Sequence, residues 1–437
     1  MRRLPLLLTT AVLCGGLAAL GALDRGTAPA RPPGSDSVRG ADRAPDGSSS
    51  LTRAIAADQQ RLRTIPGDAT GWARLGSEYV EQARITADPS YYPKAEEALH
   101  RSLQLTSKDN VDALTGLGAL ANARHLFAQA RDFAEQAIAM APAHWPAYAV
   151  LADARTQLGD DTGATDAVQQ LLDRRPGTAS FTRAAYDLEQ HGRTDDARNA
   201  LQQALDGAYD PADKAFCQFQ IAELDRDTGR TDDALTGYRQ ALRTDPAYTP
   251  ALAGQARAEA ALGRSSDAIR DYTAAIARVP LPQYLLELGE LHESLGHRTE
   301  AAEQYRLLAA ELQLATANGV VDDLTLGQYQ ADHGDPDEAV RLLRAEWARR
   351  QNVLVADALA WALHRTGADA EALTFAERAA AHGWNNALFL YHRGEIEKAL
   401  GHTGEARRHL SAALAADPGF DPLQAPAARR SLDELGR

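Results

Sequence analysis

The segment His292-Glu293-Ser294-Leu295-Gly296-His297 carries residue types that bind zinc in metalloproteases. Those enzymes place two histidines four residues apart on one helix face, with a glutamate as the general base. Here the histidines are five residues apart and a glycine lies between them. The spacing predicts that the two imidazoles lie on different faces, so we expect no metal site in this segment.

The segment Gly116-x-Gly118-x-x-Ala121 has the spacing of a dinucleotide-binding loop. Such a loop needs a strand before it and a βαβ unit around it. The sequence around these residues is typical of a helix instead. We therefore interpret them as small residues at a helix crossing, and we expect no cofactor.

Asp225, Asp227 and Gly229 together resemble part of a calcium-binding loop. The glycine comes one residue early, and the glutamate that such a loop has at position twelve is absent. We expect turn and helix-capping residues here. The sequence also contains neither a G-x-x-x-x-G-K-[ST] phosphate-binding loop nor a G-x-S-x-G nucleophile motif, so it predicts no catalytic residue.

The 437 residues include 46 Lys and Arg against 60 Asp and Glu, which gives a formal net charge of −14. An acidic chain is a poor general binder of nucleic acid, because phosphate contacts need a basic face. Only two cysteines occur, Cys14 and Cys217, which excludes a disulfide scaffold and a cysteine-based zinc site. We expect Cys217 to be a buried structural thiol.

The N-terminus combines Arg2 and Arg3 with an apolar run over residues 4–23. This pattern is typical of a secretory signal, for which Ala28-Pro29-Ala30 offers a cleavage site, and the run is also long enough to anchor the chain in a bilayer. Both interpretations place the bulk of the chain outside the cytoplasm. We expect a protein that is secreted, or anchored in the cytoplasmic membrane and facing outward.

The rest of the chain divides by composition. After the signal or anchor at 1–23, the Pro-, Gly- and Ser-rich residues 24–50 predict a flexible linker. We expect a capping helix at 51–71, a repeat domain at 72–418 and a second capping helix at 419–437. An open-ended stack of repeats needs such caps at both ends.

The repeat domain is indicated by a glycine that is followed five residues later by an alanine, at intervals of 33 to 38 residues. Glycine suits the left-handed residue that ends a helix, and the alanine begins a stripe of small residues that lets two helices approach closely. Pro246, Pro280 and Pro418 are expected to end second helices. The pairs are Gly159/Ala164, Gly192/Ala197, Gly229/Ala234, Gly263/Ala268, Gly296/Ala301, Gly334/Ala339, Gly367/Ala372 and Gly401/Ala406.

The first helix of each unit has its own pattern, which is most complete in Trp72-x-x-Leu75-Gly76-x-x-Tyr79. With this pattern the sequence resembles the tetratricopeptide repeat (TPR), a helix–turn–helix unit of about 34 residues. The resemblance implies an all-α fold, a right-handed α-solenoid of about ten repeats between Trp72 and Pro418.

Three departures from the repeat pattern predict local irregularities. The first repeat carries about seven extra residues, 85–91, between its helices. His125 takes the glycine position of the second repeat. The seventh repeat has no terminal proline and continues through 314–318, so we expect a slight kink before the eighth repeat begins at 320–323.

The resemblance further implies that ligands bind on the concave face, which the first helices line. The groove positions combine aromatic residues with a majority of carboxylates, which favours a basic and apolar segment of a protein or peptide partner. They lack the Lys, Arg and Asn set with which other family members hold a C-terminal carboxylate. These positions are Asp153, Tyr186, Glu189, Phe216, Phe219, Glu223, Arg226, Arg257, Glu290, Glu293, Trp361, Arg365, Tyr391 and Glu395.

The sequence therefore favours a non-catalytic scaffold for protein–protein interaction outside the cytoplasm, with no cofactor, metal or nucleic acid. Membrane contact is expected only through residues 4–23, if they are uncleaved. No separate catalytic domain is expected after Pro418, because only 19 residues follow it. Two alternatives stay open: an assembly or regulatory component of an envelope complex for secretion or cell-wall synthesis, and a small-ligand receptor or enzyme with an unrecognised pocket.

Overall fold

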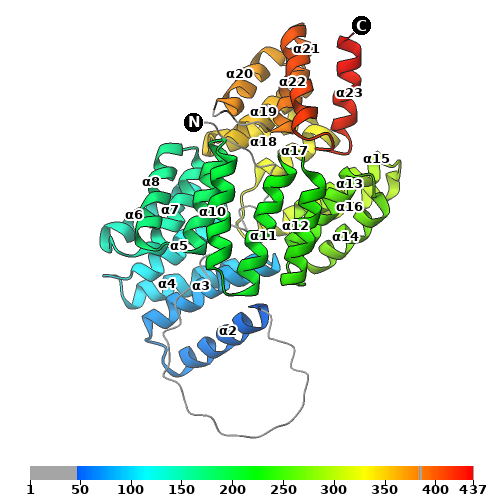
Figure 1. Ribbon diagram of the computed structural model, residues 1–437. Coiled ribbons are helices and arrows are strands. Elements are labelled where there is room, and N and C mark those ends of the chain that lie inside the picture. Colours follow the sequence, from blue (N-terminus) through cyan, green and yellow to red (C-terminus); the bar gives the residue numbers. More distant parts are fainter. Residues whose placement is uncertain (1–46, 382, 384–385, 437) are drawn as a thin grey trace, which may run out of the picture.

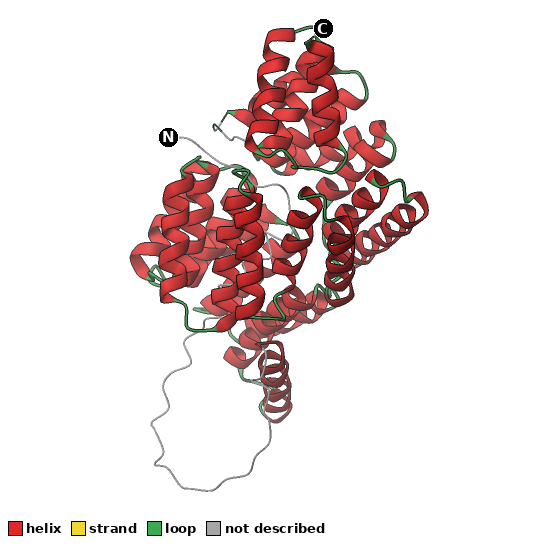
Figure 2. Cartoon of the chain, turned by 45° about the vertical axis from the view of Figure 1, so that its right-hand side comes forward, coloured by secondary structure: helices red, strands yellow, loops and turns green. Residues whose placement is uncertain are grey.

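The computed structural model describes residues 47–381, 383 and 386–436. These residues form twenty-two α-helices and no strand, which confirms the all-α class (Figures 1 and 2). The predicted signal or anchor at 1–23 lies outside the described residues, as does the predicted linker up to residue 46. Within the described ranges, no helix has both the length and the apolar character needed to span a membrane.

Twenty of these helices form ten helical hairpins, in which helices that are neighbours in sequence pack side by side. This arrangement confirms the predicted α-solenoid of about ten repeats. Repeats 1 to 10 are, in order, α3 (Ala69–Thr86) with α4 (Tyr91–Leu105), α5 (Val111–Ala123) with α6 (Phe127–Met140), α7 (Trp145–Leu158) with α8 (Asp161–Arg174), α9 (Thr178–Gln190) with α10 (Thr194–Gly207), α11 (Pro211–Arg226) with α12 (Thr231–Thr244), α13 (Thr249–Ala261) with α14 (Ser265–Arg278), α15 (Pro282–Ser294) with α16 (Arg298–Ala317), α17 (Asp323–His333) with α18 (Pro336–Arg349), α19 (Val353–Arg365) with α20 (Asp369–Ala380), and α21 (Ala387–Ala399) with α22 (Thr403–Ala416).

One helix precedes the repeats and one follows them. α2 (Gly47–Thr64) packs on α3, and α23 (Gln424–Leu435) adds Ala425 and Ala428 to the core of the last repeats. α2 begins at Gly47, so the predicted end of the linker at residue 50 is wrong. The first turn of a helix needs no buried side chain, and the polar composition of 47–50 therefore does not prevent it from being helical.

The turns inside the repeats follow the glycine pattern. φ lies between 66° and 82° at the turn glycines of repeats 3 to 7, 9 and 10, and the non-glycine His125 adopts the same conformation at 61°. Repeat 8 is an exception to the predicted turn, because Gly334 has a φ of −132°. There Asp335 caps α18 by accepting a hydrogen bond from the Asp337 amide at 3.0 Å.

Each repeat buries the alanine stripe that the sequence predicts. In repeat 5, Ala234, Tyr238 and Ala241 are all fully buried. A Cβ atom at Gly254, on the first helix of repeat 6, would lie 2.5 Å from the Tyr238 ring. Glycine at this position therefore lets the next repeat approach the tyrosine closely, which joins neighbouring repeats through one continuous core.

The junction between repeats 7 and 8 differs from the others. α16 continues to Ala317, as the missing proline predicts, and it leaves Leu307 and Leu314 each 47% exposed. α16 meets α17 through rings: Tyr305 lies 5.5 Å from Tyr329 and 4.7 Å from His333, measured between ring centroids. Long aromatic side chains thus bridge this junction.

Successive turns of the superhelix also touch, at three places far apart in sequence. The Val321 amide donates to the Arg124 carbonyl at 3.1 Å, and the Gln351 amide donates to the Leu158 carbonyl at 3.4 Å. At the third place, a Cβ atom on Gly229 would lie 2.5 Å from the carbonyl oxygen of Ala416. In each case the turn between the two helices of one repeat lies against a link, which is the short segment that follows a repeat. The link belongs to the repeat that comes five repeats later in the chain.

We call these contacts the seam, defined as the turn residues 124, 157–159, 229 and 261 together with the link residues 319–321, 350–352 and 416–419. Its best-bonded part lies at repeat 3, where Arg350 donates to the Gln157 side chain at 2.7 Å. The Asn352 side chain donates to the Gln157 carbonyl at 3.0 Å. All three side chains are buried, so the seam is a specific polar contact.

Candidate functional site

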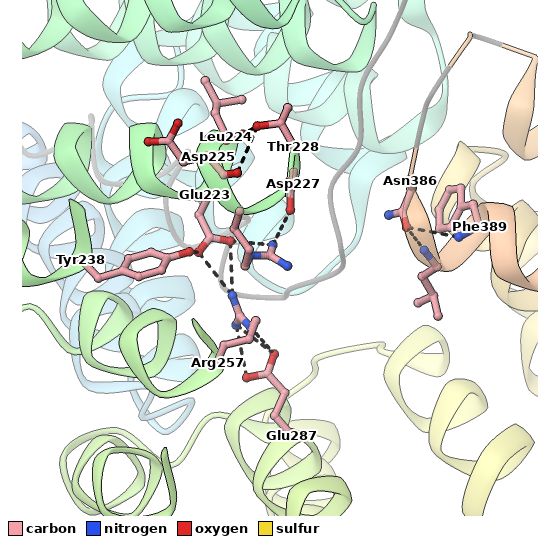
Figure 3. A network of polar contacts seen from close by, with 12 residues as sticks. Glu223, Leu224, Asp225, Asp227, Thr228, Tyr238, Arg257, Glu287, Asn386 and Phe389 are labelled. Atoms are coloured by element: carbon pink, nitrogen blue, oxygen red, sulfur yellow. Dashed lines mark hydrogen bonds and ion pairs between the residues drawn. The ribbon is translucent and has the colours of Figure 1, made fainter. Parts of the chain in front are cut away.

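The first helices of the central repeats carry a row of polar side chains that bond from one repeat to the next (Figure 3). Glu223 on α11 accepts hydrogen bonds from Arg226 at 2.9 Å and from Arg257 on α13 at 3.3 Å. Arg257 also forms an ion pair with Glu287 on α15 at 2.9 Å. Tyr238, on the second helix of repeat 5, donates to Glu223 as well.

The row continues in both directions. On the N-terminal side, Arg183 on α9 forms a two-pronged contact with Asp153 on α7 at 2.9 and 2.8 Å. On the C-terminal side, His333 on α17 lies 3.0 Å from Glu290 and 3.3 Å from Glu293 on α15. We call the whole row the polar wall. Its members are Asp153, Arg183, Glu189, Glu223, Arg226, Asp227, Arg257, Glu287, Glu290, Glu293 and His333.

The ionisation of the polar wall is uneven. Burial would raise the pKa of Glu223, but Arg226 and Arg257 outweigh burial and hold it below its usual value. Burial raises the pKa of Asp227 to about 7, although Arg226 opposes this change. Burial and the neighbouring carboxylates raise the pKa of Glu189 well above its usual value. Carboxylates therefore exceed the cations available to neutralise them.

The same excess appears at the C-terminal end of the wall. Burial raises the pKa of Glu290 to about 8, while the His333 side chain opposes that change. Burial would lower the pKa of His333, but Glu290 raises it above its usual value. Glu290 and His333 therefore hold at least one proton between them near neutral pH, and Glu293 lies 3.3 Å from the same imidazole.

Most of the predicted aromatic groove residues are core residues in this structure. Phe216, Phe219, Trp361 and Tyr391 are between 5% and 7% exposed. The Phe219 ring lies 5.8 Å from the rings of both Tyr238 and Tyr248. These four side chains are therefore not exposed anchors on the groove surface, which corrects their predicted role in recognition; for Phe219, the rings of Tyr238 and Tyr248 cover the side chain.

The other predicted groove residues separate into groups. The structure brings Glu223, Arg226 and Arg257 into one network and Glu290 with Glu293 into another. Arg365 donates instead to the Ala331 carbonyl at 3.1 Å. The remaining members lie apart from these two networks. Asp153 pairs with Arg183, Glu189 lies beside Asp227, and Tyr186 is half-buried near Gln190. One carboxylate oxygen of Glu395 has no hydrogen bond among the described residues.

Several partners in the wall and beside it are absent from the predicted groove residues. Arg183, Glu287 and His333 lie on first helices. A fourth partner is His392 on α21, whose Nδ1 lies 2.9 Å from a carboxylate oxygen of Asp357 on α19. The signal that could have found them is the spacing, because Arg183 follows Asp153 by 30 residues and Glu287 follows Arg257 by 30 residues.

The chemistry-like segments have other roles in the structure. Cβ atoms at Gly116 and Gly118 would lie 2.4 Å from Leu99 and 2.8 Å from Val150, which confirms a close helix crossing. Cys217 is fully buried, as predicted, and burial raises the pKa of its thiol to about 12.

The predicted separation of His292 and His297 is wrong, because their Nδ1 atoms lie 3.4 Å apart. The left-handed turn at Gly296 folds the chain back and brings the second ring over the first. No group of three metal-ligating side chains forms within the described part of the chain. Asp225, in the segment that resembles a calcium loop, pairs instead with Arg198 and Arg230.

A family model described as "Tetratricopeptide repeat" matches residues 219–269 and 253–315. These matches lie within repeats 5 to 7, and the same helical hairpin continues on both sides of them. Residues 219–315 therefore match the tetratricopeptide repeat family, and the helical hairpins on both sides have the same helix–turn–helix form.

One curated relative is "Cellulose synthase 1 operon protein C" of Komagataeibacter xylinus, which is 27% identical over 319 residues. The match covers 71% of this chain and 21% of the relative, so the chain spans about a fifth of that protein's length.

Solved structures with a similar arrangement have low sequence identity. A tetratricopeptide repeat protein from Parabacteroides merdae is 17% identical, with 60% of this chain and 99% of that chain covered and a TM-score of 0.35. PilW, described as a widely conserved type IV pilus biogenesis factor, is 21% identical, with 46% and 96% covered and a TM-score of 0.39. Human IFIT1 is 14% identical, with 84% and 94% covered and a TM-score of 0.45.

Proposed function

We propose that this protein is a non-catalytic interaction scaffold outside the cytoplasm, and that its polar wall binds a basic segment of a protein partner. The carboxylate of Glu293, which is 44% exposed at the edge of the wall, carries this proposal. An acidic surface attracts cationic partners and speeds their encounter. The repeat architecture supports it, because first helices of stacked repeats form an extended surface that suits a segment of chain.

We revise the expected source of affinity. Because Phe216 and Phe219 are core residues, apolar anchoring by these rings is not part of the proposal. Binding would instead depend on the less enclosed wall carboxylates. Glu293, whose side chain is 44% exposed beside His333, is the clearest of them.

A second candidate is an assembly component of an envelope complex. It is supported by the name of the curated relative, which links that protein to a cellulose synthase operon. The two candidates are compatible, because an assembly factor also works by holding a partner. They differ in the partner that would be captured. Capture of a subunit of a synthesis or export complex would support the second candidate.

The experiment is affinity capture from the native envelope with the full chain as bait, followed by surface plasmon resonance with each captured protein. Glu293→Lys should lower the association rate several-fold at low salt and change it little at high salt. Glu303→Lys is the matched control, because Glu303 is exposed on α16, a second helix. Equal effects of the two substitutions would contradict recognition by the polar wall.

A further inference from the structure

The seam joins repeats that are not neighbours, although a solenoid does not need such contacts to form. In a repeat stack each repeat contacts its neighbours, and stability is approximately the sum of those neighbouring interfaces. The seam joins turns to links four or five repeats later, with Arg350 and Gln157 separated by 193 residues. Loss of the seam would leave every neighbouring interface unchanged.

The residues at the seam are adapted to close approach. At the turn glycines of repeats 6, 7, 9 and 10, an added Cβ atom would have no neighbour within 4 Å among the described residues, so only their φ requires glycine. A Cβ at Gly159 would instead lie 2.6 Å from the Gln351 carbonyl oxygen, and one at Gly419 would lie 2.9 Å from Ala261. These glycines allow backbones from two turns of the superhelix to touch.

The closed superhelix restricts access to the polar wall. Arg226 is 3% exposed and Glu189 is 9% exposed. Arg226 also interacts with the charge of Asp417, in the link that lies on the turn of its own repeat. A partner segment that contacts these side chains therefore needs the turns to separate.

We infer that the seam is a gate: the superhelix alternates between a closed form and an open form in which the links at 319–321, 350–352 and 416–419 leave the turns that they cover. Opening exposes the buried members of the wall, Glu189 and Arg226, to a partner segment that the exposed Glu293 attracts, and closing covers them again. The purpose assigned to the gate rests on the proposed function, but the opening itself does not. It requires only that the seam is weaker than the interfaces between neighbouring repeats.

Asn352 allows the seam to be weakened with little other change. Its Oδ1 accepts the Val355 amide at 3.0 Å and so caps α19, while its Nδ2 donates to the Gln157 carbonyl. Asn352→Asp keeps the capping oxygen and removes the seam donor. Asn110→Asp is the matched control, because Asn110 caps α5 in the same way but donates locally, to Ser102 and Thr106.

Distances between spin labels measure the opening directly. Labels at Thr162→Cys and Ala348→Cys, both exposed positions close to the seam, would be placed in the full chain carrying Cys14→Ala and Cys217→Ala. We expect a main short distance, and Asn352→Asp should increase the ratio of long to short distances roughly tenfold. Asn110→Asp should leave that ratio unchanged. Identical distance distributions for Asn352→Asp and the parent would overturn the gate.

A second variant keeps the test decisive if Asn352→Asp does not fold. Leu158→Cys with Gln351→Cys offers a disulfide across the seam, at a point where the two backbones share a hydrogen bond. With Gln157→Ala added, which removes the side-chain acceptor of Arg350 and so weakens the seam, small-angle scattering should give a smaller radius of gyration for the oxidised than for the reduced protein. Equal radii would overturn the gate. Neither measurement uses a partner, so failure of the gate is distinguishable from failure to capture a binding protein.

Discussion

The polar wall and the seam are both built from buried polar contacts, but they join different parts of the chain. The wall joins each first helix to the next one, as in the Glu223–Arg257–Glu287 series, with partners 30 to 34 residues apart. The seam joins parts of the chain about five repeats apart and uses far fewer side chains. Contacts between neighbouring repeats should therefore set the stability of the stack, whereas the seam should set its shape.

Tyr238 offers the largest expected effect on the neighbouring contacts. Its fully buried ring fills the space between repeats 5 and 6, and its hydroxyl donates to Glu223 in the wall. Tyr238→Ala should lower the free energy of unfolding by about 3–5 kcal/mol in chemical denaturation. Tyr209→Ala, at a side chain that is 92% exposed, should change it by less than about 0.5 kcal/mol. Similar losses for the two variants would break the comparison.

Asp227 should make the wall sensitive to pH. Its pKa rises from 3.8 to about 7 on folding, so between these values the folded protein holds a proton that the unfolded chain has released. The stability that this carboxyl contributes is therefore complete below about pH 4 and is lost as pH rises through 7.

The parent protein should lose free energy of unfolding between pH 4 and pH 8 because Asp227 ionises in the folded state. Asp227→Asn removes this loss, so its free energy of unfolding should fall less over the same range, by about 1–2 kcal/mol. Denaturation curves at both pH values check this. Asp232→Asn, at an exposed position in the same repeat, should leave the difference unchanged. A parent-like pH profile for Asp227→Asn would mean that Arg226 keeps the carboxylate ionised throughout.

Gly419 allows the contribution of the seam to be measured separately. Gly419→Ala places a methyl group against Ala261 without a positive φ to complicate the result. We expect a loss of only about 1 kcal/mol in thermal unfolding, together with a larger radius of gyration. Gly404→Ala, which has open space around it, should show neither change. A loss as large as that of Tyr238→Ala would show that the seam contributes to stability as the neighbouring interfaces do.

The repeats could be predicted because their determinants are local. A turn glycine, the alanine stripe that follows it and a terminal proline each act within one hairpin. The glycine and alanine pairs indicated eight of the ten helix pairs, and the first-helix pattern that is most complete at Trp72 to Tyr79 indicated the others. Gly334 is informative as an exception: Asp335 and Pro336 start the next helix without a left-handed turn. Different local residues can therefore perform the same role.

The candidate site was harder to predict because it depends on contacts between repeats. The position of Phe219 within its helix says which side it occupies, but it does not say that Tyr238 and Tyr248 cover the ring. The seam had no local signal at all. Gln157 and Arg350 meet only after five repeats have set the superhelical pitch, and small angles at each junction accumulate over that distance.

Hydrogen exchange on the full chain, with and without a captured partner, tests recognition by the polar wall most directly. We expect the partner to slow exchange in peptides that carry the exposed edge of the wall, above all α11, α13 and α15. Peptides from α16 and α18, which are second helices, should be unchanged. Protection confined to α16, where Leu307 and Leu314 are exposed, with none on α11, α13 and α15, would contradict the account.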